Sequence, residues 1–385
     1  MGFLAKSKWI ILGGLVFGIL GALAVNWGNP NNMGICSACF LRDIAGALKL
    51  QANAAVQYLR PEIFGFALGA FGTSLAFREW RPRGGSSPII RFILAMCVMV
   101  GALVFMGCPI RMLLRLGGGD LSALVALGGL IVGILVGVFF LKRGFTLGRA
   151  TKMPAMAGLI IPIFALALFV LLAIKSGVLA SSTTAPGSQH VNIWLGLGLG
   201  LVIGFIVQRT RFCSIGGWRD LFLAKDFYLF SGLAAMFVGV LATNYVVGNF
   251  GNSGLFGWNL GSPHGSIAYH WGFTKQFIAL PYTDIAKGAS ALSQYIWTFL
   301  GFSLVGLAAT QMGGCPLRNT VLAGEGDTDA GISVLGYIAG GAIAVNFLLA
   351  SSGTTGLGKY ATWAVAIGLV FCIALGFLMR EKEAA

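Results

Sequence analysis

The chain has 385 residues, of which 57% are apolar and 10% are charged, and its mean hydropathy is +0.85. A soluble domain carries about 25% charged residues, so this chain cannot cover itself with polar surface and needs lipid as its solvent. Its formal net charge of +14 would suit nucleic acid, but the lysines and arginines lie between apolar runs. That distribution is the positive-inside pattern of membrane proteins, and we expect no nucleic-acid binding.

Ten apolar runs are long enough to cross a bilayer core of roughly 30 Å. The first follows Lys6 and Lys8, and we expect it to stay as a helix rather than to be removed as a signal peptide. The predicted spans are residues 9–27, 61–80, 89–106, 121–141, 154–174, 191–207, 227–247, 292–312, 332–350 and 360–378.

Basic residues orient these spans. They cluster in the connections 78–91, 142–152 and 209–225 and near both ends of the chain, and ten spans place all of these on one side. The positive-inside rule makes that side the cytoplasm, so we expect a multi-pass protein of the inner (plasma) membrane with both termini cytoplasmic. Segments 176–190 and 248–290 then lie outside. The second is long and aromatic, and is either an interfacial loop or a lid over an entrance.

Two cysteine motifs occur twice, in the same order. In each copy a Cys-Ser motif is followed six residues later by Arg-Asp, and a Cys-Pro-x-Arg motif is followed by Gly-x-Gly-Asp. The members are Cys36, Arg42, Asp43, Cys108, Arg111 and Asp120 in the first copy, and Cys213, Arg219, Asp220, Cys315, Arg318 and Asp327 in the second. This pairing indicates a duplication: residues 1–150 form the first repeat, 151–190 a linking helix and outer loop, 191–352 the second repeat and 353–385 a terminal helix.

The two copies start five spans apart, and an odd offset predicts opposite orientations in the membrane. Cys36 and Cys108 then lie on connections facing out, and Cys213 and Cys315 on connections facing in. Each motif is too short to cross, yet more apolar than a free loop, which suits a re-entrant half-helix lining a cavity. We therefore predict an all-α fold with about ten transmembrane helices, four short re-entrant helices and two inverted repeats, an arrangement typical of transporters.

A Cys-Pro pair suits the start of a helix, whose free N–H groups form an anion site. The pathway candidates are the four repeated cysteines, Cys39 (whose counterpart is Gly216), Arg111 and Arg318. A neutral thiol is a weak donor with a soft sulphur, suited to a sulphur or selenium anion, whereas a thiolate would favour covalent capture. Each arginine either faces an anion or packs against a helix end.

The other polar and sulphur-containing side chains have simpler interpretations. Cys97 and Cys372 lie mid-span without repeat partners and are expected to be inert. The Arg-Asp pairs are interpreted as local salt bridges or caps, and Asp120 and Asp327 as N-caps. The remaining cysteine and histidine spacings predict no metal site, no cofactor and no disulfide framework. The chain also lacks a Walker A motif, so no ATP hydrolysis is expected.

The motifs Gln208-Arg-Thr-Arg-Phe-Cys-Ser-Ile-Gly-Gly-Trp-Arg-Asp220, Met106-Gly-Cys-Pro-Ile-Arg111 and Gly313-Gly-Cys-Pro-Leu-Arg318 resemble the YeeE/YedE family of sulphur-transport membrane proteins, in particular its selenium-transporter branch. The resemblance implies an inverted-repeat fold with short re-entrant helices and thiosulfate uptake through central cysteines. The implied counterparts are Cys36 or Cys39, Cys108 and Cys315, with Cys213 at the symmetric fourth position. The prolines after Cys108 and Cys315 and the long segment 248–290 depart from the family pattern, which makes a selenium compound as good a candidate as thiosulfate.

Three functions from different classes remain open. The first is a permease, rather than an enzyme, that imports a small sulphur- or selenium-containing solute. The second is a membrane redox or sulphur-transfer protein, which the Cys36-x-x-Cys39 pair would serve. The third is an assembly subunit without transport of its own. The expected partners are the bilayer and the solute, with a cytoplasmic sulphur- or selenium-carrier protein as a further candidate.

Overall fold

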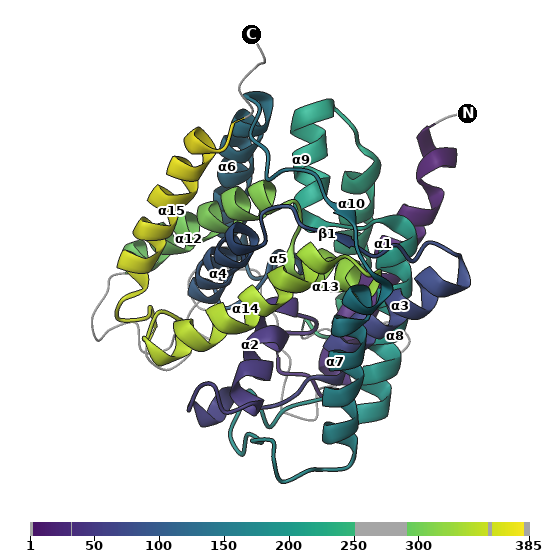
Figure 1. Cartoon of the computed structure of the whole chain (residues 1–385). Helices are drawn as coiled ribbons and strands as arrows, with labels where there is room; N and C mark the ends of the chain where they lie inside the picture. The colour runs from purple at the N-terminus through teal and green to yellow at the C-terminus, as the bar shows by residue number, and fades with distance from the viewer. Residues whose placement is uncertain (1–2, 32, 251–290, 353–355, 381–385) are drawn as a thin grey trace.

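The computed structural model describes residues 3–31, 33–250, 291–352 and 356–380, and its main elements are α-helices (Figure 1). Most of the predicted segment 248–290 lies outside the described residues. The long helices are α1 (Phe3–Asn26), α3 (Pro61–Ala76), α4 (Pro88–Val104), α6 (Ser122–Lys142), α7 (Ala155–Ala173), α8 (Ile193–Thr210), α10 (Tyr228–Val246), α12 (Ala291–Met312), α14 (Thr328–Asn346) and α15 (Ala361–Leu378). The short ones are α2 (Ser37–Ala47), α5 (Pro109–Gly117), α9 (Ser214–Ala224) and α13 (Pro316–Gly324), with a 3₁₀ turn at Ala54–Val56.

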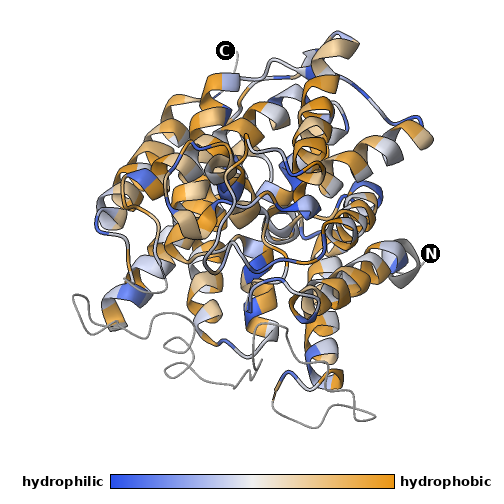
Figure 2. Ribbon diagram, turned by 90° about the horizontal axis from the view of Figure 1, so that it is seen from below, coloured by the Kyte–Doolittle hydropathy of each residue, from blue (hydrophilic) through white to orange (hydrophobic). Residues whose placement is uncertain are grey.

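The chain is a multi-pass membrane protein by the length and apolar character of its helices. Within the described residues, nine helical stretches are long and apolar enough to cross a bilayer. Apolar residues cover most of the helix surfaces (Figure 2), and large side chains such as Trp9, Ile89 and Trp363 are exposed on them. Such a surface is stable against lipid rather than against water.

The predicted span 61–80 does not reach its expected length. Helix α3 ends at Ala76, because Arg78 adopts a left-handed conformation (φ 54°) and Glu79 turns toward the end of α8. Its 16 residues cover about 24 Å, at about 1.5 Å per residue. This helix is therefore too short to count with the nine, and the described structure does not show the predicted total of ten spans.

The long helices pack in pairs that exchange partners between the two halves of the chain. Helix α1 packs along α10 and α3 along α8, while α4 packs along α14 and α6 along α12. Glycines permit this close approach: a Cβ added at Gly14 would meet the backbone carbonyl of Gly232, and one added at Gly65 would meet the backbone of Gly200. Small residues serve this purpose where helices associate within lipid.

The three basic connections and the last turn of α15 meet at one end of the bundle. Arg209 pairs with Glu79 at 2.8 Å, and strand β1 (Arg83–Gly84) pairs with strand β2 (Thr151–Lys152) in an antiparallel ladder that the all-α prediction did not include. Phe145 bridges to Arg380 after α15. The start of α1 and the end of α15 both lie toward this end in Figure 1. The loop 176–190 contacts the segment after α2 at the opposite end, since the Ala180 amide bonds to the Ala47 carbonyl.

Candidate functional site

The four repeated cysteines occupy the same local position, the N-cap of a short helix. Cys36, Cys108, Cys213 and Cys315 immediately precede α2, α5, α9 and α13. The thiols of Cys36, Cys213 and Cys315 accept hydrogen bonds from backbone N–H groups in the first turn, at 3.3, 3.3 and 3.5 Å. All four residues are buried. The predicted helix starts are confirmed at both Cys-Pro motifs.

Cys36, Cys39 and Cys108 form a first thiol cluster. The sulphur of Cys36 lies 2.8 Å from that of Cys39 and accepts a hydrogen bond from the backbone N–H of Cys108 at 3.4 Å. Arg111 donates to the Cys39 sulphur at 3.4 Å and to the Met106 carbonyl. All three cysteines are free thiols, so this cluster places three soft sulphur atoms beside one guanidinium.

Cys213 and Cys315 form a second thiol cluster with a different environment. Their sulphur atoms are 3.9 Å apart. Arg318 contacts this cluster through its backbone N–H, while its side chain donates to Glu325 at 3.0 Å and to the Val207 carbonyl at 3.4 Å. The position equivalent to Glu325 in the first repeat is Gly118. The two predicted arginines therefore differ: Arg111 contacts a thiol, and Arg318 is held by a carboxylate.

The structure groups the predicted cysteines three and two. Among the described residues, no thiol of one cluster lies within hydrogen-bonding distance of a thiol of the other. The clusters are nevertheless neighbours through their helices, because α2 contacts α13 and α5 contacts α9. Cys97 and Cys372 belong to neither cluster: they lie on α4 and α15, two helices that contact each other.

The Arg-Asp pairs are local salt bridges, as predicted, at 2.6 Å for Arg42–Asp43 and 2.8 Å for Arg219–Asp220. The N-cap prediction is confirmed for Asp327, which accepts from the Ala330 N–H at 2.9 Å. Asp120 accepts from the first N–H of α6, that of Ser122, at 3.0 Å, although it lies one residue before the N-cap position and also forms a buried pair with Arg115 at 2.7 Å. That pair has no counterpart in the second copy, where Leu322 stands in the place of Arg115.

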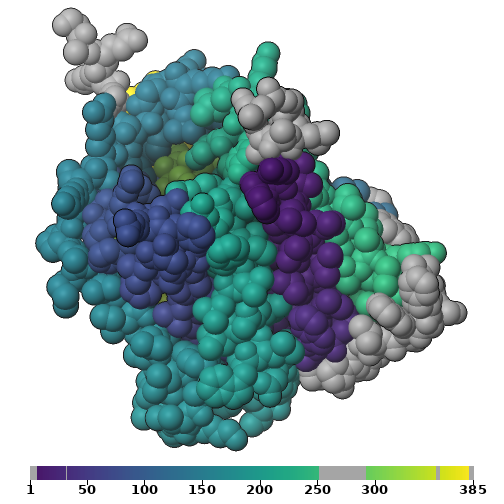
Figure 3. All heavy atoms as spheres, turned by 90° about the vertical axis from the view of Figure 1, so that its right-hand side faces the viewer, coloured from purple at the N-terminus to yellow at the C-terminus, as the bar shows by residue number. Residues whose placement is uncertain are grey.

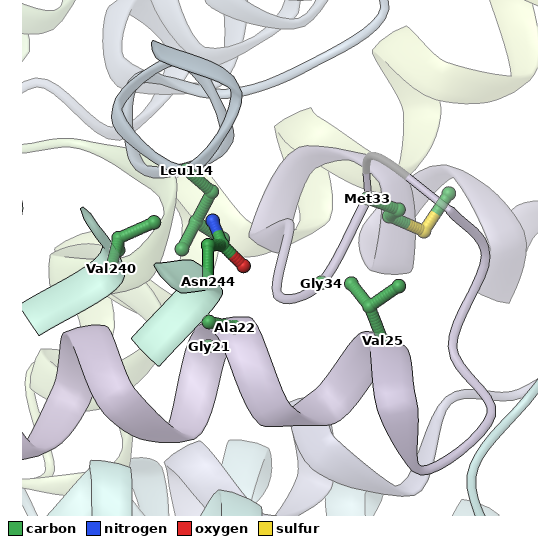
Figure 4. A pocket seen from close by; sticks show the side chains of 8 residues that line it. All are labelled: Gly21, Ala22, Val25, Met33, Gly34, Leu114, Val240 and Asn244. Atoms are coloured by element: carbon green, nitrogen blue, oxygen red, sulfur yellow. The ribbon is translucent and has the colours of Figure 1, made fainter. Parts of the chain in front are cut away.

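A small recess lies beside the segment that leads to Cys36. Its volume is about 10 Å³, space for roughly one water molecule. Figure 4 shows it between α1, the Met33–Gly34 segment, Leu114 of α5 and Asn244 of α10. The Asn244 amide donates to the Gly117 carbonyl at 3.1 Å. The recess is too small to hold a solute anion.

A larger cleft of about 150 Å³ opens at the end where the basic connections meet. Near that end, Figure 3 shows a hollow between the blue and teal segments, with yellow-green atoms at its floor. Glu325 connects the cleft to the second thiol cluster, since it accepts from Arg318 and, at 3.3 Å, from Arg211. Six charged side chains line the cleft: Glu79, Arg81, Arg83, Arg211, Glu325 and Asp327.

Two acidic members of this cleft, Glu79 and Glu325, were not predicted from the sequence. Glu79 lies within a run of arginines, where only the positive charge was considered, and hydrogen bonds from Gln208 and Arg209 lower the pKa of its carboxyl below the usual range. Glu325 occupies the variable position of the second Gly-x-Gly-Asp motif, where the first copy has Gly118. This difference between the copies is the feature of the sequence that could have identified Glu325. The described residues contain no group of three or more histidine, cysteine or carboxylate side chains placed to hold a metal ion.

Neither a scan of protein-family models nor a search of the curated proteins found a match to this chain.

Proposed function

We propose that this membrane protein is a permease that imports a small sulphur- or selenium-containing anion, such as thiosulfate or selenite, past its two thiol clusters. The observation that carries the proposal is that four repeated cysteines, all buried, each occupy the N-cap position of a short helix, in two groups of mutually contacting thiols. The resemblance to the YeeE/YedE family supports it independently. In this proposal the short helices are re-entrant, and ten spans form two inverted repeats.

The exchange of helix partners between the halves of the chain supports a pseudo-two-fold relation between the two copies, which the proposed inverted repeats require. Equivalent helices are α1 and α8, α3 and α10, α4 and α12, and α6 and α14. Under this equivalence the α1–α10 contact maps onto the α8–α3 contact, and α4–α14 maps onto α12–α6. The basic end of the bundle is then the cytoplasmic one. A reporter fused after Arg380 is expected to lie in the cytoplasm, and a periplasmic signal would contradict this orientation.

The proposed path uses weak contacts in sequence. An anion reaching the first thiol cluster meets the Arg111 guanidinium, the S–H groups and the free N–H groups that begin α2 and α5. The second cluster offers a similar set of donors at the starts of α9 and α13. Since its arginine is already paired with Glu325, the anion is held there more weakly and can leave through the cleft. Several weak sites in series allow passage better than one strong site.

The energetics limit how this import proceeds. A divalent anion entering against −100 mV faces roughly 4.6 kcal/mol, at about 2.3 kcal/mol per charge. Import therefore needs cation entry, a neutral form of the solute, or rapid consumption inside the cell, where a sulphur- or selenium-carrier protein would be a suitable acceptor.

Uptake into proteoliposomes tests the proposal. Wild-type protein should take up thiosulfate or selenite in preference to sulfate, which has no soft sulphur or selenium centre. Cys108→Ser and Cys315→Ser should abolish this uptake, because serine keeps a hydrogen-bonding group but removes the polarisable sulphur. Cys97→Ser is the matched control and should transport normally. Normal transport by both variants at the clusters would show that their thiols only pack.

A sulphur-transfer protein is the second candidate, and the 2.8 Å approach of the Cys36 and Cys39 sulphur atoms favours it. A thiolate would attack the outer sulphur of thiosulfate, the sulphur–sulphur bond would break, and sulfite would leave with the electron pair as a cysteine persulfide formed. Release of sulfite in stoichiometric amount during the uptake assay, with a persulfide detected by mass spectrometry, would distinguish it from the permease.

A further inference from the structure

A buried network of charges lies at the end of the bundle opposite the basic connections. It consists of Arg42 and Asp43 on α2, Arg60 just before α3, and Glu62 in the first turn of α3. None of these residues is more than 8% exposed, and Arg60, Asp43 and Glu62 are at most 1% exposed. Ionisable residues at such depth are costly and mark functional positions more often than structural ones.

The two carboxylates of this network are treated unequally. Asp43 receives both arginines: Arg42 donates to its Oδ1 at 2.6 and 2.9 Å, and Arg60 Nε lies 3.5 Å from its Oδ2. Glu62 accepts a hydrogen bond from the Asn29 amide, at 2.8 Å on Oε1, and its Oε2 atom, like the Oδ2 atom of Asp43, is buried without a hydrogen-bond partner among the described residues. In the described part of the chain, no arginine or lysine nitrogen comes within 4 Å of Glu62.

Asn29 links Glu62 to the arginines without neutralising it. Its amide donates to Glu62, while its carbonyl oxygen accepts from Arg60 at 3.2 Å. A buried carboxylate held by a neutral amide is the costliest charge of the network to maintain, and protonation at Oε2 would satisfy it.

Among the described residues, the other elements around Glu62 bring no cation that pairs with its carboxylate in place of a proton. Helix α8 presents Gly196, where a Cβ would approach the Glu62 carboxylate at 3.4–3.5 Å, and α7 has no titratable residue. Helix α13 carries Arg318, which is paired with Glu325. The remaining titratable neighbours are Tyr58 and His190, whose rings stack at 4.0 Å beside Arg60.

We propose that Glu62 is a proton-binding site that controls anion access to the first thiol cluster, an inference that rests on the proposed anion import. With Glu62 ionised, two arginines balance two carboxylates and the network is neutral. With Glu62 protonated, the same network carries one net positive charge. Arg42 stays paired with Asp43 in both states, so the charge lies on Arg60, whose guanidinium is 5.9 Å from the ring of Phe40, the residue that follows Cys39 on α2. The proton comes from the aqueous phase at that end of the molecule, and no other bond changes.

The test measures initial rates of thiosulfate uptake into proteoliposomes as the external pH is varied between about 5 and 8 at fixed internal pH. Wild-type uptake should rise as the external pH falls. Glu62→Gln, which mimics the protonated carboxyl, should be independent of pH and about tenfold faster than wild type at the alkaline end, because an uncompensated positive charge raises the local anion concentration. Asp226→Asn, which changes an exposed carboxylate between α9 and α10 at the opposite end of the bundle, is the matched control and should keep the wild-type pH profile.

A second measurement does not need transport. The infrared carbonyl band of a protonated carboxyl group should titrate over this pH range in wild-type protein and be missing from Glu62→Gln. If Glu62→Gln does not fold, Glu62→Asp should shift the midpoint of the uptake profile, since the shorter side chain moves away from Asn29.

The outcomes separate the two proposals. Wild-type uptake that ignores external pH, a Glu62→Gln profile equal to that of wild type, or an unshifted Glu62→Asp profile overturns the role of Glu62 while leaving anion import intact. If wild-type protein takes up none of the anions, the proposed import fails and the control by Glu62 fails with it.

Discussion

Replacing Glu325 with glutamine should weaken the fold and strengthen anion binding at the same time. Glu325 holds Arg318 at 3.0 Å and Arg211 at 3.3 Å, and the side chains of Arg318 and Glu325 are 9% and 8% exposed. Glutamine keeps the shape and one acceptor but loses the negative charge. Arg318 is then left as a buried cation three residues after Cys315.

The size of the effect follows from this geometry. Two unit charges 3.0 Å apart attract by about 5–6 kcal/mol at an effective dielectric constant of about 20. Removing one partner of a fully buried pair costs about 3–5 kcal/mol. Arg211 is half-exposed in an open cleft, and glutamine retains a hydrogen bond worth about 1 kcal/mol, so we expect a loss of about 2–3 kcal/mol.

Thermal unfolding in detergent measures the first effect, as a fall of about 2–4 °C in the apparent midpoint. Titration with thiosulfate measures the second. A charge-assisted hydrogen bond from the released Arg318 is worth about 1.5–3 kcal/mol, so affinity should rise by roughly tenfold or more. Asp327→Asn is the matched control: its partner Arg83 is 47% exposed, and asparagine still caps α14. If Glu325→Gln unfolds at the same temperature as the Asp327→Asn control and binds thiosulfate no more tightly than wild type, the Glu325 carboxylate does not restrain Arg318.

Two further predictions concern stability. Gly14→Val should prevent α1 from packing along α10, since a Cβ there meets a backbone carbonyl that cannot move aside, whereas Gly198→Val on α8 enters open space and should unfold at the wild-type temperature. A destabilised Gly198 variant with an unaffected Gly14 variant would refute this packing. Because Gln208 and Arg209 lower the pKa of Glu79 in the folded state, its contribution to stability is present above the ordinary glutamate pKa of about 4.3 and is lost as the pH falls below it. Glu79→Gln should remove that acid-side loss from unfolding curves, and an unchanged curve would count against it.

Hydropathy and turn chemistry predict the helices well because these signals are local. The apolar runs lie on the long helices, and proline in the first turn predicts where α5 and α13 begin. The repeated motifs also identify the cysteines that the structure groups. Span 61–80 is the exception. Its C-terminal end is decided by the contact of Glu79 with Gln208 and Arg209, residues about 130 positions away, which no local pattern contains.

The environment of each cysteine cluster could not be predicted, because it depends on the positions at which the two copies differ. Arg111 and Arg318 are equivalent in the motif, yet only the second copy has a carboxylate, Glu325, within reach. The buried position of Glu62 was equally hidden. A single glutamate after a proline looks like an ordinary first-turn residue, and its isolation follows only from Asp43 taking both arginines.

A second difference between the copies, Gly34 in the first and Arg211 in the second, predicts unequal access to the two thiol clusters. At the end with the small recess, Gly34 packs against the backbone of α1. The equivalent residue at the other end is Arg211. Both residues have a left-handed backbone, with φ 52° at Gly34 and φ 60° at Arg211. Arg211, however, forms an ion pair with Glu325 in a cleft of about 150 Å³. At about 1 M salt the Debye length is about 3 Å, so the half-exposed pair is screened while packed backbone is not. A charged, membrane-impermeant thiol reagent applied from the cleft side should therefore label the second thiol cluster faster at high salt. Applied from the opposite side, it should label the first thiol cluster at a rate that does not depend on salt. Equal salt dependence on both sides would show that ion pairs do not restrict access through the cleft.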